Sequence, residues 1–289
     1  MTQQPPRIAL ALQGGGAHGA FTWGVLDRLL EEVTADRLKI TAVSGASAGA
    51  LNAATLGAGL AHSPEVARTD LRALWQTIDR RANAFSVPAP TSWLPGTLPT
   101  PFNIDWTPGA FWREVWRLVY SPYDMWWYDN PLKGIVSGSI DFAALNDTGR
   151  APPVYISATE VRDTRRDIFT QPDLAVDHIL ASACIPEIFR AIEIGSNVYW
   201  DGGVLGNPPL EPLLDHADDR VVVWVNPLHR PGGAPQSARD ILDRLNEITF
   251  NISLVAELRG IDLINRLIAA GTLSDPRYLR SIRLSSGPF

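Results

Sequence analysis

The sequence has a single cysteine and no excess of positive charge. Cys184 has no partner within the chain, so an internal disulfide is excluded, and a reducing, cytoplasmic setting is favoured. The 25 lysines and arginines are outnumbered by 31 aspartates and glutamates, which gives a formal net charge of −6. A chain of this charge without a Lys/Arg-rich run is not expected to bind nucleic acid, nor an anionic membrane through charge alone.

Long hydrophobic runs are also lacking. No apolar stretch is long enough to span a bilayer, and the polar start of the chain, Met1–Pro6, does not resemble a signal peptide. Apolar residues still make up 45% of the 289 residues, and charged residues 19%. This balance is typical of globular proteins, so we expect one α/β domain over residues 1–289.

The order of the predicted elements favours a parallel sheet. Strands over 8–12 and 40–43 are each followed by a glycine-rich turn and a helix, over 20–32 and 48–60, an alternation typical of βαβ units. Later elements are predicted as a helix from residue 63, strands at 154–159, 167–170, 197–200 and 221–225, and a helix over 174–183.

Two segments depart from this pattern. Residues 86–128 hold recurrent prolines and six of the ten tryptophans, which predicts an irregular insertion with one helix near 108–120. These aromatics suit a lid, an acyl-chain groove or a patch for peripheral membrane contact, but packing onto the main domain or a dimer face explains them equally well. A C-terminal helical segment at about 237–270 is predicted to be amphipathic from its apolar positions, Ile241, Leu245, Ile248, Ile252, Val255 and Leu258.

The two glycine-rich turns carry the chemistry. Gly45-Ala46-Ser47-Ala48-Gly49 fits the G-x-S-x-G elbow, in which a sharp strand-to-helix turn exposes the serine as a nucleophile. The earlier turn, Gly14-Gly15-Gly16-Ala17-His18-Gly19, offers backbone N–H groups at a helix start, where a developing anion is stabilised. The first turn also fits the dinucleotide fingerprint, but the carboxylate expected at the end of the second strand is missing. Together the turns predict an acyl-transfer site.

Ser47 needs a base, and the histidines are poor candidates. None follows the last strand in the short loop that a triad histidine usually occupies, although His18 lies in the first turn and stays open as a supporting residue; the five are His18, His62, His178, His216 and His229. Asp201, in Trp200-Asp201-Gly202-Gly203 after an apolar strand, is the better candidate. An Asp-Gly pair taken alone often only stabilises a turn and has no catalytic role.

These motifs, in this order, resemble those of the patatin-like phospholipases. The family pattern is a G-G-G-x-[R/K]-G loop, a G-x-S-x-G elbow and a D-G-[G/A] turn, and the block 181–189 is similar to its A-S-x-A-x-P-x-x-F motif. The resemblance spans about residues 7–226 and implies a three-layer α/β/α fold with a mainly parallel central sheet and a Ser47–Asp201 dyad. His18 departs from the usual basic residue, and Gln13 stands where many members have Asp.

The expected reaction is a two-step acyl transfer. Asp201 takes the proton of Ser47, which forms an acyl-enzyme, and Asp201 then activates water. Backbone N–H groups of the loop at Gly14, Gly15 and Gly16 and of Ala48 are expected to form the oxyanion hole. No cofactor or metal is expected. The expected substrates are fatty-acyl esters of phospholipids or lysophospholipids. An esterase or thioesterase for other acyl esters, including polyester oligomers, and a catalytically idle lipid-binding module stay open, as does the oligomeric state.

Overall fold

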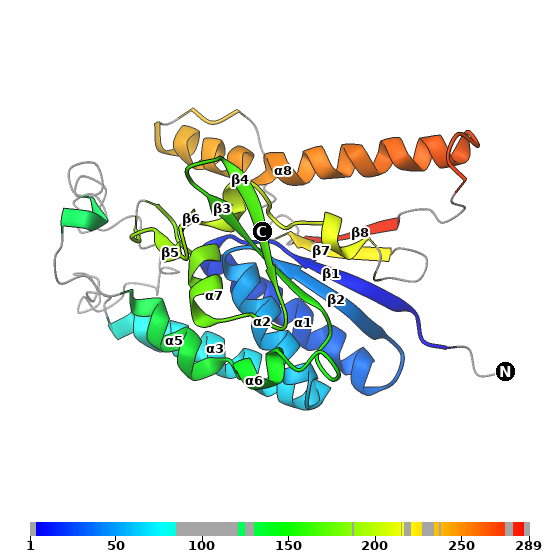
Figure 1. The fold of residues 1–289 in the computed structure, drawn as a ribbon, viewed down its shortest axis with the longest axis horizontal. Coiled ribbons are helices and arrows are strands. Elements are labelled where there is room, and N and C mark those ends of the chain that lie inside the picture. The colour runs from blue at the N-terminus through cyan, green and yellow to red at the C-terminus, as the bar shows by residue number, and fades with distance from the viewer. Residues whose placement is uncertain are drawn as a thin grey trace, which may run out of the picture.

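A computed structural model describes most of the chain (Figure 1). The described residues are 4–84, 121–124, 130–186, 188–214, 216, 221–226, 234–236, 238–274 and 280–285. The predicted insertion at 86–128 therefore lies outside the described residues, apart from a short 3-10 turn, Pro122–Asp124. His229 also lies outside them.

A single eight-stranded sheet forms the centre of the fold, in the order β5-β6-β3-β2-β1-β7-β8, with β4 paired to β3 off this path. The neighbours β3, β2, β1, β7 and β8 are parallel, whereas β4 and β6 pair with β3 in the antiparallel direction. This confirms the mainly parallel sheet; β5 and β8 were not predicted. The strands are β1 (Arg7–Leu12), β2 (Lys39–Gly45), β3 (Val154–Glu160), β4 (Arg165–Thr170), β5 (Ile192–Ile194), β6 (Asn197–Trp200), β7 (Val221–Asn226) and β8 (Arg280–Ser285).

Helices cover both faces of the sheet, which confirms the three-layer arrangement (Figure 1). The helices on one face are α1 (Gly19–Thr34), α2 (Ala48–Leu60), α3 (Pro64–Ala84), α5 (Pro131–Ser139), α6 (Phe142–Leu145) and α7 (Val176–Ser182), and α8 (Ala238–Ala269) covers the other. Alternating residues of β1 serve the two layers, because successive side chains of a strand point to opposite faces. Leu10 and Leu12 join the core under α1 and α2, whereas Ala9 and Ala11 pack in the cluster that contains Leu254 of α8.

The helix that follows the serine turn is buried along almost its whole length. Every residue of α2 from Ala48 to Gly59 is buried, and most are alanine, glycine or leucine. A helix of small residues can approach its neighbours closely on all sides, so α2 lies between the sheet and α3. This packing fixes the N-terminus of α2, where Ser47 is the N-cap residue.

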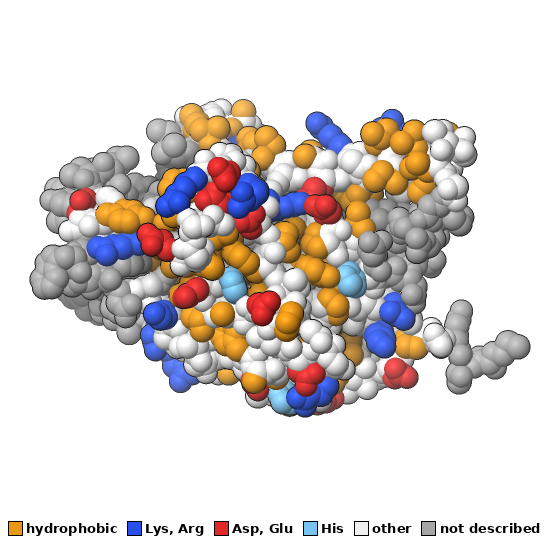
Figure 2. All heavy atoms as spheres, in the orientation of Figure 1, with side chains coloured by type: hydrophobic (Ala, Val, Ile, Leu, Met, Phe, Trp, Pro, Cys, Tyr) orange, Lys and Arg blue, Asp and Glu red, His pale blue; other side chains and the backbone are white. Residues whose placement is uncertain are grey.

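The predicted C-terminal helix forms, but most of its predicted apolar stripe faces solvent. Leu254 and Ile261 are buried against the sheet and Leu258 packs beside them. The other positions of the predicted stripe are exposed, namely Ile241, Leu245, Ile248, Ile252 and Val255. Figure 2 shows hydrophobic side chains gathered over both ends of α8, at the top of the view. The residues that hold α8 to the sheet are therefore not the regular stripe that the sequence displays.

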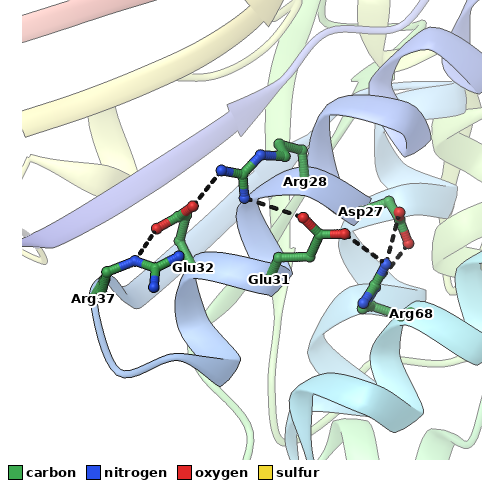
Figure 3. A network of polar contacts seen from close by, with 6 residues as sticks. All are labelled: Asp27, Arg28, Glu31, Glu32, Arg37 and Arg68. Atoms are coloured by element: carbon green, nitrogen blue, oxygen red, sulfur yellow. Dashed lines mark hydrogen bonds and ion pairs between the residues drawn. The ribbon is translucent and has the colours of Figure 1, made fainter.

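Ion pairs connect α1 to α3 at the surface (Figure 3). The Arg68 guanidinium of α3 donates through Nε and Nη2 to the two carboxylate oxygens of Asp27, both at 2.9 Å, and also pairs with Glu31 at 3.1 Å. This contact holds the pKa of Asp27 below its ordinary value. Since the three side chains are partly exposed, the pairs add little to stability, about 1 kcal/mol or less each.

Candidate active site

The two glycine turns begin side by side at the carboxyl end of the parallel sheet. Leu12, the last residue of β1, is in register with Gly45, the last residue of β2. Each strand then leads through its turn into a helix, α1 or α2. Parallel α/β sheets bind ligands at this edge, since the loops that follow neighbouring strands meet there. The positions of the turns therefore agree with the expected site.

Ser47 adopts the backbone conformation of a nucleophile elbow. It has φ 54° and ψ −124°, which non-glycine residues rarely adopt, and such strain is typical of functional positions. Close packing forces the turn, because a Cβ on Gly49 would overlap the carbonyl oxygen of Leu12. The Ser47 N–H donates to the hydroxyl oxygen of Ser182 at 3.0 Å. Ser47 is 4% exposed, so its hydroxyl lies within the protein rather than on an open surface.

The first glycine turn lies directly against Ser47. A Cβ on Gly14 would come within 2.6 Å of the Ser47 Cβ and 2.7 Å of the Ala46 carbonyl oxygen, so only glycine fits. The Gly14 N–H itself donates to Asn207 Oδ1 at 2.6 Å. This hydrogen bond occupies the N–H group, so Gly14 is suited to placing the loop rather than to binding an oxyanion.

The next two residues of this turn, Gly15 and Gly16, differ from Gly14 in their N–H groups. Among the described residues, no backbone or side-chain group accepts a hydrogen bond from the N–H of Gly15 or Gly16. The first N–H of α2, on Ala48, is likewise without an intrahelical acceptor, as at every helix start. His18, predicted as a supporting residue, is exposed, and its Nδ1 lies 3.0 Å from the Gly15 carbonyl oxygen. Its ring therefore contacts the outer side of the loop.

Asp201 is fully buried at the end of β6. Its Oδ1 accepts a hydrogen bond from the Gly203 N–H at 2.7 Å, so it also caps the short 3-10 turn Gly202–Val204. Its backbone is fixed on both sides, since its N–H donates to the Cys184 carbonyl and its own carbonyl accepts from Thr159 Oγ1. The carboxylate therefore caps the turn that follows it, and the backbone that carries it is held by hydrogen bonds.

One short segment of the 181–189 block links the two predicted dyad residues. Ser182 accepts the N–H of Ser47, and Cys184, two residues later, accepts the N–H of Asp201. Burial, together with the charge of the Asp201 carboxylate, raises the pKa of the Cys184 thiol to about 12. The structure therefore brings the elbow, the Gly14 loop and the Asp201 turn into one neighbourhood around this segment.

The other described histidines, His62, His178 and His216, make their contacts away from this neighbourhood. His62 Nε2 lies 3.4 Å from Asp141 Oδ2, and His216 Nε2 lies 2.6 Å from the Tyr155 hydroxyl oxygen. His178 Nδ1 accepts the N–H of Ala175 at the start of α7. Within the described part of the chain, no group of three or more His, Cys, Asp or Glu side chains is placed to hold a metal ion. The same part contains no helix with the length and apolar character needed to traverse a bilayer.

Sequence reasoning missed two residues that organise the site, Ser182 and Asn207. Ser182 belongs to the 181–189 motif, but its partner Ser47 lies 135 positions away along the chain. Asn207 precedes two prolines in a segment that gives no sign of chemistry, and its partner Gly14 is 193 positions away. Only the buried polar character of such residues in the folded protein reveals their role.

Comparison with known proteins gives one family match and two structural likenesses. A family model described as patatin-like phospholipase matches residues 10–214. Among solved structures, VipD from Legionella pneumophila is similar at 15% identity and a TM-score of 0.43, covering 99% of this chain and 62% of that one. The ExoU–SpcU complex from the type III secretion system of Pseudomonas aeruginosa is similar at 20% identity and a TM-score of 0.36, covering 77% and 44%.

This chain thus spans less than two thirds of the length of either structure, and at these values neither bears on its activity. No curated protein matches it. The family model, in contrast, covers well over half of the chain and includes both glycine turns and the Asp201 turn. The chain therefore belongs to the patatin-like phospholipase family.

Proposed function

We propose that this protein is a serine acyl hydrolase that cleaves fatty-acyl esters of phospholipids or lysophospholipids through a Ser47–Asp201 dyad. The observation that carries the proposal is the strained elbow at Ser47, with the Gly14 loop packed against it. The family supports a lipid ester as the substrate. The link through Ser182 and Cys184 to the buried Asp201 supports the pairing of hydroxyl and carboxylate.

In the first step Asp201 accepts the proton of the Ser47 hydroxyl while Oγ attacks the ester carbonyl carbon. The carbonyl oxygen becomes an oxyanion, which the N–H groups of Gly15, Gly16 and Ala48 stabilise; in other hydrolases one such donor contributes about 3 kcal/mol. The N-terminus of α2 adds a favourable dipole. Collapse of the intermediate breaks the bond to the alcohol oxygen, which leaves with the proton from Asp201 and yields an acyl-enzyme.

In the second step water replaces the alcohol. Asp201 takes a proton from the water, whose oxygen attacks the acyl-enzyme, and the same N–H groups hold the second oxyanion. Ser47 recovers its proton as the fatty acid departs. Complete burial of Asp201 keeps bulk water from solvating the carboxylate, which favours proton acceptance in the transition state.

The test is fatty-acid release from a panel of phospholipids, lysophospholipids and simple acyl esters by the wild type, Ser47→Ala and Asp201→Asn. We expect both variants to lose about 10³-fold or more of the activity, because each removes a group that takes part in bond making. Ser44→Ala is the matched control. Ser44 is also a buried serine at the end of β2, but its hydroxyl donates to the Pro209 carbonyl.

Labelling with a fluorophosphonate provides an independent measurement. An adduct on Ser47 with hydrolysis of simple esters but of no phospholipid would favour the esterase alternative. The idle lipid-binding module is expected to form no adduct. Undiminished hydrolysis by Ser47→Ala would overturn the proposal.

A further inference from the structure

Asn207 is a buried asparagine at which three parts of the site meet. Its side chain is fully buried, with Oδ1 accepting the Gly14 N–H at 2.6 Å and Nδ2 donating to the Phe250 carbonyl of α8 at 3.2 Å. Its backbone is held as well, since its N–H donates to Ser253 Oγ and its carbonyl accepts from Gln13 Nε2. One residue therefore connects the glycine loop, the segment after Asp201, and α8.

A glycine loop depends on such a connection. Gly14, Gly15 and Gly16 have no side chains that could anchor their peptide groups by packing, and glycine has the widest range of backbone conformations. Gly14 is limited on one side by Ser47 and Ala46. The Gly14 N–H is held by the hydrogen bond that it donates to Asn207 Oδ1. Rotation of this peptide would change the direction of the N–H groups of Gly15 and Gly16, which are proposed to bind the oxyanion.

We propose that Asn207 is a positioning residue of the acyl transfer, which orients the glycine loop so that its N–H groups face the oxyanion. This inference rests on the proposed function. The carboxamide suits the task because its oxygen accepts from the Gly14 N–H while its NH2 group donates to the Phe250 carbonyl. An alanine offers neither, and a carboxylate would place an oxygen against the Phe250 carbonyl.

Asn207→Ala tests the role, with Asn146→Ala as the matched control. Asn146 has the same hydrogen-bond pattern, accepting the N–H of Leu174 at 3.0 Å and donating to the Leu174 carbonyl at 2.8 Å, but it joins the end of α6 to the segment before α7. We expect Asn207→Ala to lower kcat for ester hydrolysis by about 10- to 100-fold with KM changed less than about threefold, since misplacement by about 1 Å has an effect of this size. The rate of fluorophosphonate labelling of Ser47 should fall in parallel. Asn146→Ala should retain kcat.

Urea unfolding of both variants separates folding from catalysis. If Asn207→Ala does not unfold cooperatively, Ser253→Ala is measured in its place; it removes only the acceptor of the Asn207 N–H and should lower kcat by about two- to fivefold. A folded Asn207→Ala with the kcat of Asn146→Ala, or a loss confined to KM, would overturn the inference. These comparisons test the role of Asn207 once the wild type is shown to hydrolyse an ester and Ser47→Ala is shown not to. If the wild type hydrolyses no ester, or if Ser47→Ala is as active as the wild type, the proposed function is refuted instead.

Discussion

Replacing Ser182 by alanine should weaken both the fold and the reaction, because Ser182 holds the backbone of the nucleophile. The Ser47 N–H donates to Ser182 Oγ at 3.0 Å, and both residues are buried, so no water replaces the lost acceptor. An unsatisfied buried N–H costs about 1–3 kcal/mol. For a chain of this size we expect the midpoint of thermal unfolding to fall by about 2–4 °C for each kcal/mol.

The effect on catalysis follows from the strain at Ser47. Its backbone lies at φ 54°, a conformation that persists only where the surroundings enforce it, at a typical cost of 1–3 kcal/mol. Without Ser182 Oγ the elbow can relax toward ordinary backbone angles, which shifts the hydroxyl away from the oxyanion donors. A displacement of about 1 Å lowers kcat by about 100-fold, so a fall of 10- to 100-fold is expected.

The assay measures kcat for hydrolysis of a soluble acyl ester together with thermal unfolding, for Ser182→Ala and Ser44→Ala. Ser44 is an equally buried serine, whose hydroxyl donates to the Pro209 carbonyl at 2.6 Å and makes no contact with the Ser47 N–H. Both variants lose one buried hydrogen bond, so their stabilities should fall by similar amounts. Equal kcat in the two variants would refute the argument that Ser182 maintains the elbow.

Three further predictions concern the surroundings of the site and the surface. Gly49→Ala should yield no folded protein by circular dichroism, because its Cβ would overlap the Leu12 carbonyl; a cooperatively folded variant would contradict the close packing of the turn. Cys184, with its raised pKa of about 12, should resist iodoacetamide at pH 8 in the native state and react in urea. Arg68 lowers the pKa of Asp27, so their pair stabilises the fold above the ordinary aspartate pKa, and this contribution is lost as the pH falls through the lowered value. Arg68→Ala should therefore lower the free energy of unfolding, measured in urea, by about 1 kcal/mol or less at pH 7, and by less still in acid. A larger loss in acid than at pH 7 would contradict this assignment of the pair.

The elements around Ser47 could be predicted because their signals are local. The run that became β1, the periodic helix α1 and the small-residue helix α2 each show their period within a few residues, with glycine at the joints. The strand β5 has only three residues, and β8, Arg280–Ser285, mixes charged with apolar side chains, so neither has a pattern of its own. Such strands form because a neighbouring strand offers hydrogen bonds, and a sequence does not show that neighbour.

The same distinction separates the residues of the site. Ser47 and Asp201 stand in motifs whose glycines reflect the shape of each turn, so both could be proposed from short stretches of sequence. Ser182 and Asn207 contribute a single acceptor to a backbone N–H more than a hundred positions away. A serine or an asparagine can occur in many segments, so neither residue type signals such a contact. The atoms proposed for the chemistry were therefore predictable, whereas those that hold them in place were not.

Gln13 is a departure from the family pattern that belongs to this supporting framework. Its Nε2 donates to Asn251 Oδ1 of α8 at 2.7 Å and to the Asn207 carbonyl at 3.3 Å. The aspartate found at this position in many members has no N–H group and would set a buried carboxylate against two acceptor oxygens. The helix α8 lies beyond the segment that the family model matches. The helix α8 supplies hydrogen-bond partners for Gln13, which precedes Gly14 in the chain, and for Asn207, which accepts the Gly14 N–H. A segment outside the family match therefore supports the loop that is proposed to bind the oxyanion.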